Sequence, residues 1–157
     1  MVTSEDEDLA EKIVDCLRGA FISGSFITNP DDANDIDIVL THSMLDKAYR
    51  HDWWSEFERE TTEQTAKYNT DDEDGDYELV ANWRYNNINL VVVNDKFFGA
   101  YLAAKEIMEE RPAMFNTRAK RVYLHTQLKS HVREMFAEFA WQKFSASPVV
   151  SFSSELE

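Results

Sequence analysis

The segment 35–40, with the sequence DIDIVL, alternates acidic and apolar residues in a way that is typical of a half-buried β-strand. Side chains alternate along a strand, so Asp35 and Asp37 are expected on one face while the isoleucines face the core. Two adjacent carboxylates repel each other, and a divalent cation relieves that repulsion best. The turn Gly24-Ser25, which nine intervening residues separate from Asp35, offers backbone N–H groups and a hydroxyl, which suit a phosphate. The combination indicates nucleotide chemistry that depends on a metal.

The length and composition of the chain limit the class of protein. It has 157 residues, of which 43% are hydrophobic, so we expect one folded domain with a substantial core. No apolar run approaches the roughly 18 residues that cross a bilayer, and the N-terminus is acidic, unlike a secretory signal. The single cysteine, Cys16, excludes an internal disulfide and fits a reducing compartment. We therefore expect a cytoplasmic protein with no membrane partner, located in the host cytoplasm if it is viral.

The charge of the chain is strongly acidic and unevenly distributed. The formal net charge is −14, with acidic blocks at residues 5–8 and 71–76. The basic residues gather late, at Arg118, Lys120, Arg121, Lys129, Arg133 and Lys143. Such a charge repels bulk nucleic acid unless the positive side chains are clustered, so a phosphate-bearing ligand is expected to contact Arg118 and Arg121. A mimic of nucleic-acid charge that blocks a DNA-binding partner is an alternative explanation of the net charge.

Hydrophobic periodicity predicts an α+β fold, with a small mixed sheet and flanking helices. Helices are expected at about residues 5–18, 43–60, 95–110 and 117–143, with Ser4, Ser43, Asp95 and Asn116 as N-caps. Strands are expected at residues 20–23, 35–41, 77–83 and 88–93, and the last two form a hairpin through residues 84–87. The polar segment 61–75 is expected to be a surface loop. We expect a single domain over residues 1–144 and a flexible tail over residues 145–157.

The motif and its surroundings resemble the polymerase-β-type nucleotidyltransferase superfamily. The pattern of that superfamily begins with an apolar residue, then a glycine, and then either glycine or serine. A spacer of about ten residues follows, and after it the motif Asp-apolar-Asp-apolar. Gly24, Ser25, Asp35 and Asp37 match it, and the order of helices and strands around them agrees. A weaker resemblance, over residues 116–122, is to small phage-encoded nucleotidyltransferase-like proteins.

This resemblance implies a nucleotidyltransferase-like fold and a reaction. A nucleoside monophosphate would move from an NTP to a hydroxyl of an RNA, a protein or a small molecule, with release of pyrophosphate. Asp35 and Asp37 would bind Mg²⁺ or Mn²⁺, and Gly24 and Ser25 would hold the β- and γ-phosphates.

The chain departs from the superfamily pattern at the third acid. The strand at residues 88–93 resembles the strand that usually carries this acid, but the matching residue is Asn89. An amide oxygen can bind a metal but cannot accept a proton at neutral pH. Glu78, on the neighbouring strand of the hairpin, is an alternative source of the carboxylate. The candidate catalytic residues are therefore Asp35, Asp37, Asn89 and Glu78.

Two functions remain open at this point. The first is a small metal-dependent nucleotidyltransferase whose acceptor is held by the last helices or by the second subunit of a homodimer. The second is a catalytically reduced relative that binds a nucleotide or a host protein and acts as an interaction or inhibitor protein. Asn89 and the net charge favour the second function, whereas the intact pair Asp35 and Asp37 favours the first. A purely structural explanation also stands, in which the two aspartates face solvent on an edge strand and Gly24 serves only a turn.

Overall fold

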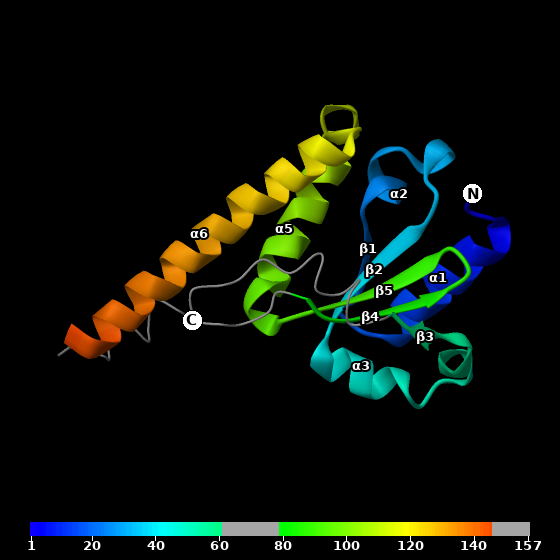
Figure 1. Cartoon of the computed structure of the whole chain (residues 1–157), viewed down its shortest axis with the longest axis horizontal. Helices are drawn as coiled ribbons and strands as arrows, with labels where there is room; N and C mark the ends of the chain where they lie inside the picture. The colour runs from blue at the N-terminus through cyan, green and yellow to red at the C-terminus, as the bar shows by residue number, and fades with distance from the viewer. Residues whose placement is uncertain (61–78, 146–157) are drawn as a thin grey trace.

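The computed structural model describes residues 1–60 and 79–145, with side chains up to residue 131. This part of the chain forms five α-helices and one five-stranded mixed sheet with the strand order β1-β2-β5-β4-β3 (Figure 1). The predicted α+β class, with a small mixed sheet and flanking helices, is confirmed. The predicted loop at residues 61–75, Glu78 and, apart from Ser145, the predicted tail at residues 145–157 lie outside the described residues.

The sheet is built around one parallel pair of strands. The strands are β1 (Phe21–Ser23), β2 (Ile36–Thr41), β3 (Glu58–Arg59), β4 (Leu79–Tyr85) and β5 (Ile88–Val93). β2 and β5 are parallel, and the other neighbouring pairs are antiparallel. The predicted hairpin forms between β4 and β5, but its turn is confined to Asn86-Asn87 because Arg84 and Tyr85 extend β4. Asn86 has a left-handed φ of 51°, a conformation that asparagine tolerates better than most residues.

Three of the four predicted helices lie close to their predicted positions, a short helix at Ser25–Thr28 was not predicted, and the N-caps differ. They are α1 (Ser4–Cys16), α2 (Ser25–Thr28), α3 (His42–Ala48), α5 (Asp95–Glu110) and α6 (Arg118–Ser145), with 3-10 helices at Pro30–Asp32, Asp52–Glu56 and Pro112–Phe115. The predicted caps Ser4, Ser43, Asp95 and Asn116 are wrong, and the residues that precede these helices are Thr3, Thr41, Asn94 and Thr117. Ser, Thr, Asp and Asn all cap well, so a neighbouring residue of the same kind takes the position. Within the described residues, no helix has both the length and the apolar character that crossing a membrane requires.

The helix predicted over residues 43–60 is wrong beyond Ala48. α3 ends there, a 3-10 helix follows, and the chain then pairs with β4 as strand β3. The aromatic rings of this segment explain the difference. Trp53 and Phe57 are each only 5% exposed and pack edge-to-face, with ring centroids 5.8 Å apart. Burial of these rings under the sheet outweighs the helical periodicity of the local sequence.

The sheet separates two apolar layers. On one face, Ile36 and Ile38 of β2 are completely buried and pack with residues of α1 and α3, including Ile13. On the other face, Val39 and Val93 pack with residues of α5. α5 and α6 contact each other along this second side of the molecule (Figure 1). The side chain of Asp37 alternates with those of Ile36 and Ile38, so the polar site described next lies on the α5 side.

Candidate functional site

A row of polar residues crosses four strands on the α5 side of the sheet. Ser23 lies opposite Asp37, Asp37 opposite Asn89, and Asn89 opposite Arg84. Residues paired in this way project from the same face of a sheet. The alternation predicted for the segment 35–40 is therefore confirmed, since Asp35 and Asp37 share a cavity whereas the isoleucines beside Asp37 lie in the core.

Asp37, Asn89 and Arg84 of this row line one wall of a cavity of about 610 Å³. Its lining includes every predicted site residue that the structure describes, namely Gly24, Ser25, Asp35, Asp37, Asn89, Arg118 and Arg121. The first four come from the β1–β2 region and the two arginines from the first turn of α6. Glu78, the alternative third acid, lies outside the described residues, and its role stays a prediction. The structure thus brings together side chains that are more than 80 positions apart in the sequence.

Gly24 lies directly against the carboxylate of Asp37. A Cβ atom at residue 24 would lie 2.6 Å from Oδ2 of Asp37, and the backbone of Gly24 has a φ of +78°. Both observations require glycine, the first for space and the second for backbone conformation. The turn therefore brings the main chain at Gly24 directly against the carboxylate of Asp37, closer than any residue with a side chain would allow.

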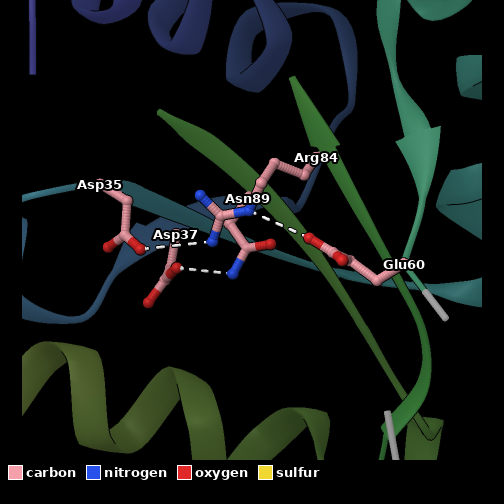
Figure 2. Close-up of polar contacts among 5 residues, drawn as sticks. All are labelled: Asp35, Asp37, Glu60, Arg84 and Asn89. Atoms are coloured by element: carbon pink, nitrogen blue, oxygen red, sulfur yellow. Dashed lines mark hydrogen bonds and ion pairs between the residues drawn. The ribbon is translucent and has the colours of Figure 1, made fainter. Parts of the chain in front are cut away.

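The carboxyl group of Asp37 has an unusual environment. Burial, reinforced by the negative charge of Asp35, raises the pKa of Asp37 to about 6. Three interactions oppose this shift. Nδ2 of Asn89 donates a hydrogen bond to Oδ1 of Asp37 over 3.1 Å (Figure 2). The positive charges of Arg84 and Arg121 also lower the pKa of Asp37. Oδ1 of Asn89 is buried and has no hydrogen-bond partner within the described residues. An acceptor oxygen without a donor therefore lies beside a carboxyl group that resists ionisation.

Arg84 and Glu60 extend this site and were not among the predicted residues. Nη2 of Arg84 lies 3.5 Å from Oδ2 of Asp35, and its Nε donates to Oε1 of Glu60 over 3.1 Å (Figure 2). The backbone N–H of Glu60 donates to the carbonyl oxygen of Asn82 over 2.8 Å, which fixes it beside β4. The sequence pattern assigned Glu60 to a helix and Arg84 to a turn, so neither residue was predicted to belong to the site. The alternation Ala81-Asn82-Trp83-Arg84 is the signal that places Arg84 on the polar face.

Arg121 connects α6 to the segment that follows the Gly-Ser turn. Its Nη1 donates to Oγ1 of Thr28 over 3.2 Å and to the carbonyl oxygen of Phe115 over 3.1 Å. Burial lowers the pKa of Arg121, the charge of Asp37 raises it, and the neighbouring charge of Arg118 lowers it. The charges of Asp37 and Arg121 therefore interact across the cavity.

The donor set of the cavity can be tested against a divalent cation. Within the described residues, no group of three or more His, Cys, Asp or Glu side chains is arranged to hold a metal. Asp35, Asp37 and the unpartnered amide oxygen of Asn89 are oxygen donors, which are the ligands that Mg²⁺ and Mn²⁺ prefer. Mg²⁺ is commonly bound by one or two carboxylates together with water and substrate phosphates. These three residues therefore fit a cation that completes its ligands with a phosphate.

Known proteins give no further guide to the site. No protein-family model, curated protein or solved structure matches this chain.

Proposed function

We propose that the protein is a metal-dependent nucleotidyltransferase that moves a nucleoside monophosphate from an NTP to a hydroxyl of an RNA, a protein or a small molecule. One observation carries the proposal. The carboxylate pair Asp35 and Asp37, the turn at Gly24, and the arginines at positions 118 and 121 line the same cavity. The resemblance of the Gly-Ser and Asp-Ile-Asp motifs to the polymerase-β-type superfamily supports it.

The charges in the cavity suit a nucleoside triphosphate that carries a divalent cation. Asp35 and Asp37 lie on the sheet and would hold the cation, whereas Arg118 and Arg121 would bind phosphate oxygens. Gly24 lines the same cavity, and because it carries no side chain the turn can lie directly against the carboxylate of Asp37. The volume of about 610 Å³ is typical of small-molecule sites, which measure roughly 300 to 1,000 Å³.

The reaction assigns distinct tasks to these residues. The acceptor hydroxyl forms a bond to the α-phosphorus, the bond from that phosphorus to the bridging oxygen breaks, and pyrophosphate leaves. When bound, the cation neutralises charge on the phosphates. The arginines of α6 hold the departing phosphates and the sheet carboxylates fix the cation. Asn89 cannot accept the hydroxyl proton, so Glu60, another carboxylate on the cavity wall, is the described residue proposed for that step.

A second candidate function is a catalytically reduced relative that binds a nucleotide, or a host protein, without transfer. Two contacts favour it: Asn89 occupies the place of an acid and donates to Asp37, and Arg84 pairs with Asp35. Both candidates are compatible with nucleotide binding at the same carboxylates. Nucleotide binding therefore tests the site, and transfer of the nucleoside monophosphate separates the two functions.

Titration calorimetry with each of the four NTPs, with and without Mg²⁺, tests the site. Wild-type protein is expected to bind at least one NTP in the presence of Mg²⁺. The variants Asp35→Asn and Asp37→Asn are expected to bind it at least tenfold more weakly, because each loses a charged metal ligand. Asp46→Asn, an equal charge change in α3, is the matched control and should bind as wild type does. Equal binding by all four proteins, or no binding by the wild type, would show that the site is wrongly assigned.

A further inference from the structure

We propose that the guanidinium of Arg84 is a competitor of the divalent cation for Asp35. It neutralises Asp35 and Glu60 before any ligand binds. When a cation and a nucleotide enter together, it leaves Asp35 and pairs with a phosphate. The inference rests on the proposed function, because it describes how the same carboxylates accept their cation. It adds a coupling between cation and nucleotide that the motif does not imply.

The first argument is the position of the guanidinium. It lies between the carboxylates of Asp35 and Glu60, at 3.5 Å and 3.1 Å (Figure 2). Arg84 starts from β4, two strands away from Asp37, and the length of its side chain carries the charge to the β2 side of the site. A cation that binds Asp35 would therefore meet a positive charge already paired with that carboxylate.

The second argument is the charge of the whole cavity. Its charged lining residues are Asp32, Asp35, Asp37, Glu60, Arg84, Arg118 and Arg121. Four acids and three arginines give a formal charge of −1 before any ligand enters. A divalent cation is therefore attracted weakly while Arg84 stays in place, and strongly once Arg84 turns away or gains an anionic partner.

Arg84 and Arg121 are held by different kinds of partner. Arg121 donates to the hydroxyl of Thr28 and to the carbonyl of Phe115, which are contacts that a cation does not compete for. The polar contacts of the Arg84 side chain, within the described residues, are to Asp35 and Glu60. Its side chain is also 40% exposed, so it has space to reorient. Of these two arginines, Arg84 is thus the one whose partners would change when a cation binds.

The exchange makes cation and nucleotide bind cooperatively. A cation alone must displace Arg84 from Asp35 and gives the guanidinium no new partner. A cation that arrives with a triphosphate supplies phosphate oxygens, which are good bidentate partners for arginine. The nucleotide is therefore expected to strengthen cation binding more in the wild type than in a variant without this charge.

Binding of Mn²⁺ alone, followed by the electron paramagnetic resonance signal of free Mn²⁺, tests the inference without nucleotide or activity. Arg84→Gln removes the competing charge, so its Mn²⁺ affinity should exceed that of wild type by roughly three- to tenfold. Arg59→Gln is the matched control. Arg59 is an exposed neighbour of Glu60 and lies opposite Trp83 in the sheet, hence on the other face from Arg84. It should stay within about twofold of the wild-type affinity, because its side chain lies on the other face of the sheet from the carboxylates and is exposed to solvent.

Arg84→Lys guards against loss of structure in the glutamine variant. Lysine keeps the charge but not the two-pronged guanidinium, so its Mn²⁺ affinity should lie between those of wild type and Arg84→Gln. Circular dichroism melts of all variants show which of them are folded, and the folded ones are compared. Mn²⁺ affinities of Arg84→Gln and Arg84→Lys at or below that of Arg59→Gln would overturn the inference.

The inference and the proposed function fail separately. Tighter Mn²⁺ binding by Arg84→Gln, with no nucleoside monophosphate transfer by any variant, would support competition by Arg84 and refute the nucleotidyltransferase activity. Transfer by the wild type, with unchanged Mn²⁺ binding in Arg84→Gln, would support the nucleotidyltransferase activity and refute competition by Arg84. Addition of a non-hydrolysable NTP completes the test, because its enhancement of Mn²⁺ binding should be larger in wild type than in Arg84→Gln.

Discussion

Asn89 lies opposite Asp37 on the neighbouring parallel strand, and its Nδ2 donates a hydrogen bond to Oδ1 of Asp37 over 3.1 Å. The residue that departs from the superfamily pattern is therefore in direct contact with a predicted metal ligand. As a donor, the amide stabilises the ionised form of Asp37, while its own oxygen stays buried without a hydrogen-bond partner in the described part of the chain. The side chain at this position thus cannot accept a proton, as a carboxylate would, but its oxygen is a potential ligand for a cation.

Asn89→Asp is expected to improve cation binding at a cost in the stability of the metal-free protein. A third carboxylate beside Asp37 adds repulsion, which should lower the free energy of unfolding by about 1 to 2 kcal/mol without a cation. Mn²⁺ should restore that stability, and nucleotidyl transfer should rise if only the third acid is missing. Thermal melts with and without Mn²⁺ measure the effect. A variant that gains no activity, while Glu78→Ala loses it, would assign the third acid to Glu78.

The stability of the protein should depend on pH through Asp37. Burial and the charge of Asp35 raise its pKa from 3.8 to about 6, so the folded protein keeps a proton that the unfolded chain releases between these values. The free energy of unfolding therefore falls as pH rises towards 6, and the loss is complete above it.

Asp37→Asn removes this dependence and can still accept the hydrogen bond from Asn89. The variant is expected to be more stable than wild type by about 2 kcal/mol at pH 8 and by less than about 1 kcal/mol at pH 4. Urea unfolding at both pH values provides the comparison. An equal difference at pH 4 and pH 8 would mean that Asp37 ionises as an ordinary aspartate does.

Gly24→Ala is expected to be destabilised by about 2 to 4 kcal/mol. The new Cβ would lie 2.6 Å from Oδ2 of Asp37, and alanine would be strained at a φ of +78°. Gly99→Ala is the matched control, since residue 99 is inside α5 and a Cβ there meets no atom within 4 Å. That control should gain up to about 1 kcal/mol from helix propensity. Chemical denaturation measures both, and equal stabilities of the two variants would refute the close approach of Gly24 to Asp37.

Arg121→Gln should weaken NTP binding roughly tenfold, because it removes a charge expected to contact a phosphate. Thr28→Val is the matched comparison: it removes one hydrogen-bond acceptor of Arg121 and keeps the charge. It should change NTP affinity by less than about threefold. Calorimetry with Mg²⁺ and the preferred NTP measures both. Equal losses in the two variants would mean that Arg121 acts by holding α6 in place.

The sequence predicted those parts of the site that depend on local periodicity. Alternation alone placed Asp35 and Asp37 on one face, whereas Asn89 was identified by the resemblance of its strand to the strand that usually carries the third acid, and it lies where β5 pairs with β2. The Gly-Ser motif identified Gly24, although its contact with the Asp37 carboxylate required the structure. The placement of Asp35 and Asp37 is confirmed because side chains in a half-buried strand alternate with a period of two, and a single sequence displays that alternation.

Glu60 could not be placed from the sequence, because its position depends on packing between distant segments, and the face of Arg84 depends on how far β4 extends. β3 forms where burial of Trp53 and Phe57 ends the helical pattern, and this brings Glu60 to β4. Arg84 belongs to the polar face only because β4 continues past the expected turn. Local periodicity does not predict where the burial of aromatic side chains ends a helix. It also does not predict how many residues a hairpin strand contains.

Transfer of label from each α-labelled NTP, with Mg²⁺ or Mn²⁺, tests the central claim most directly. The acceptors would be cellular RNA, protein and small-molecule extract, and Asp35→Ala/Asp37→Ala would be the control. We predict that one or more NTPs label an acceptor with wild type and a cation, that pyrophosphate is released in equal amount, and that the double variant transfers nothing. Binding of NTP without transfer to any acceptor, or equal transfer by the double variant, would contradict a nucleotidyltransferase at this cavity.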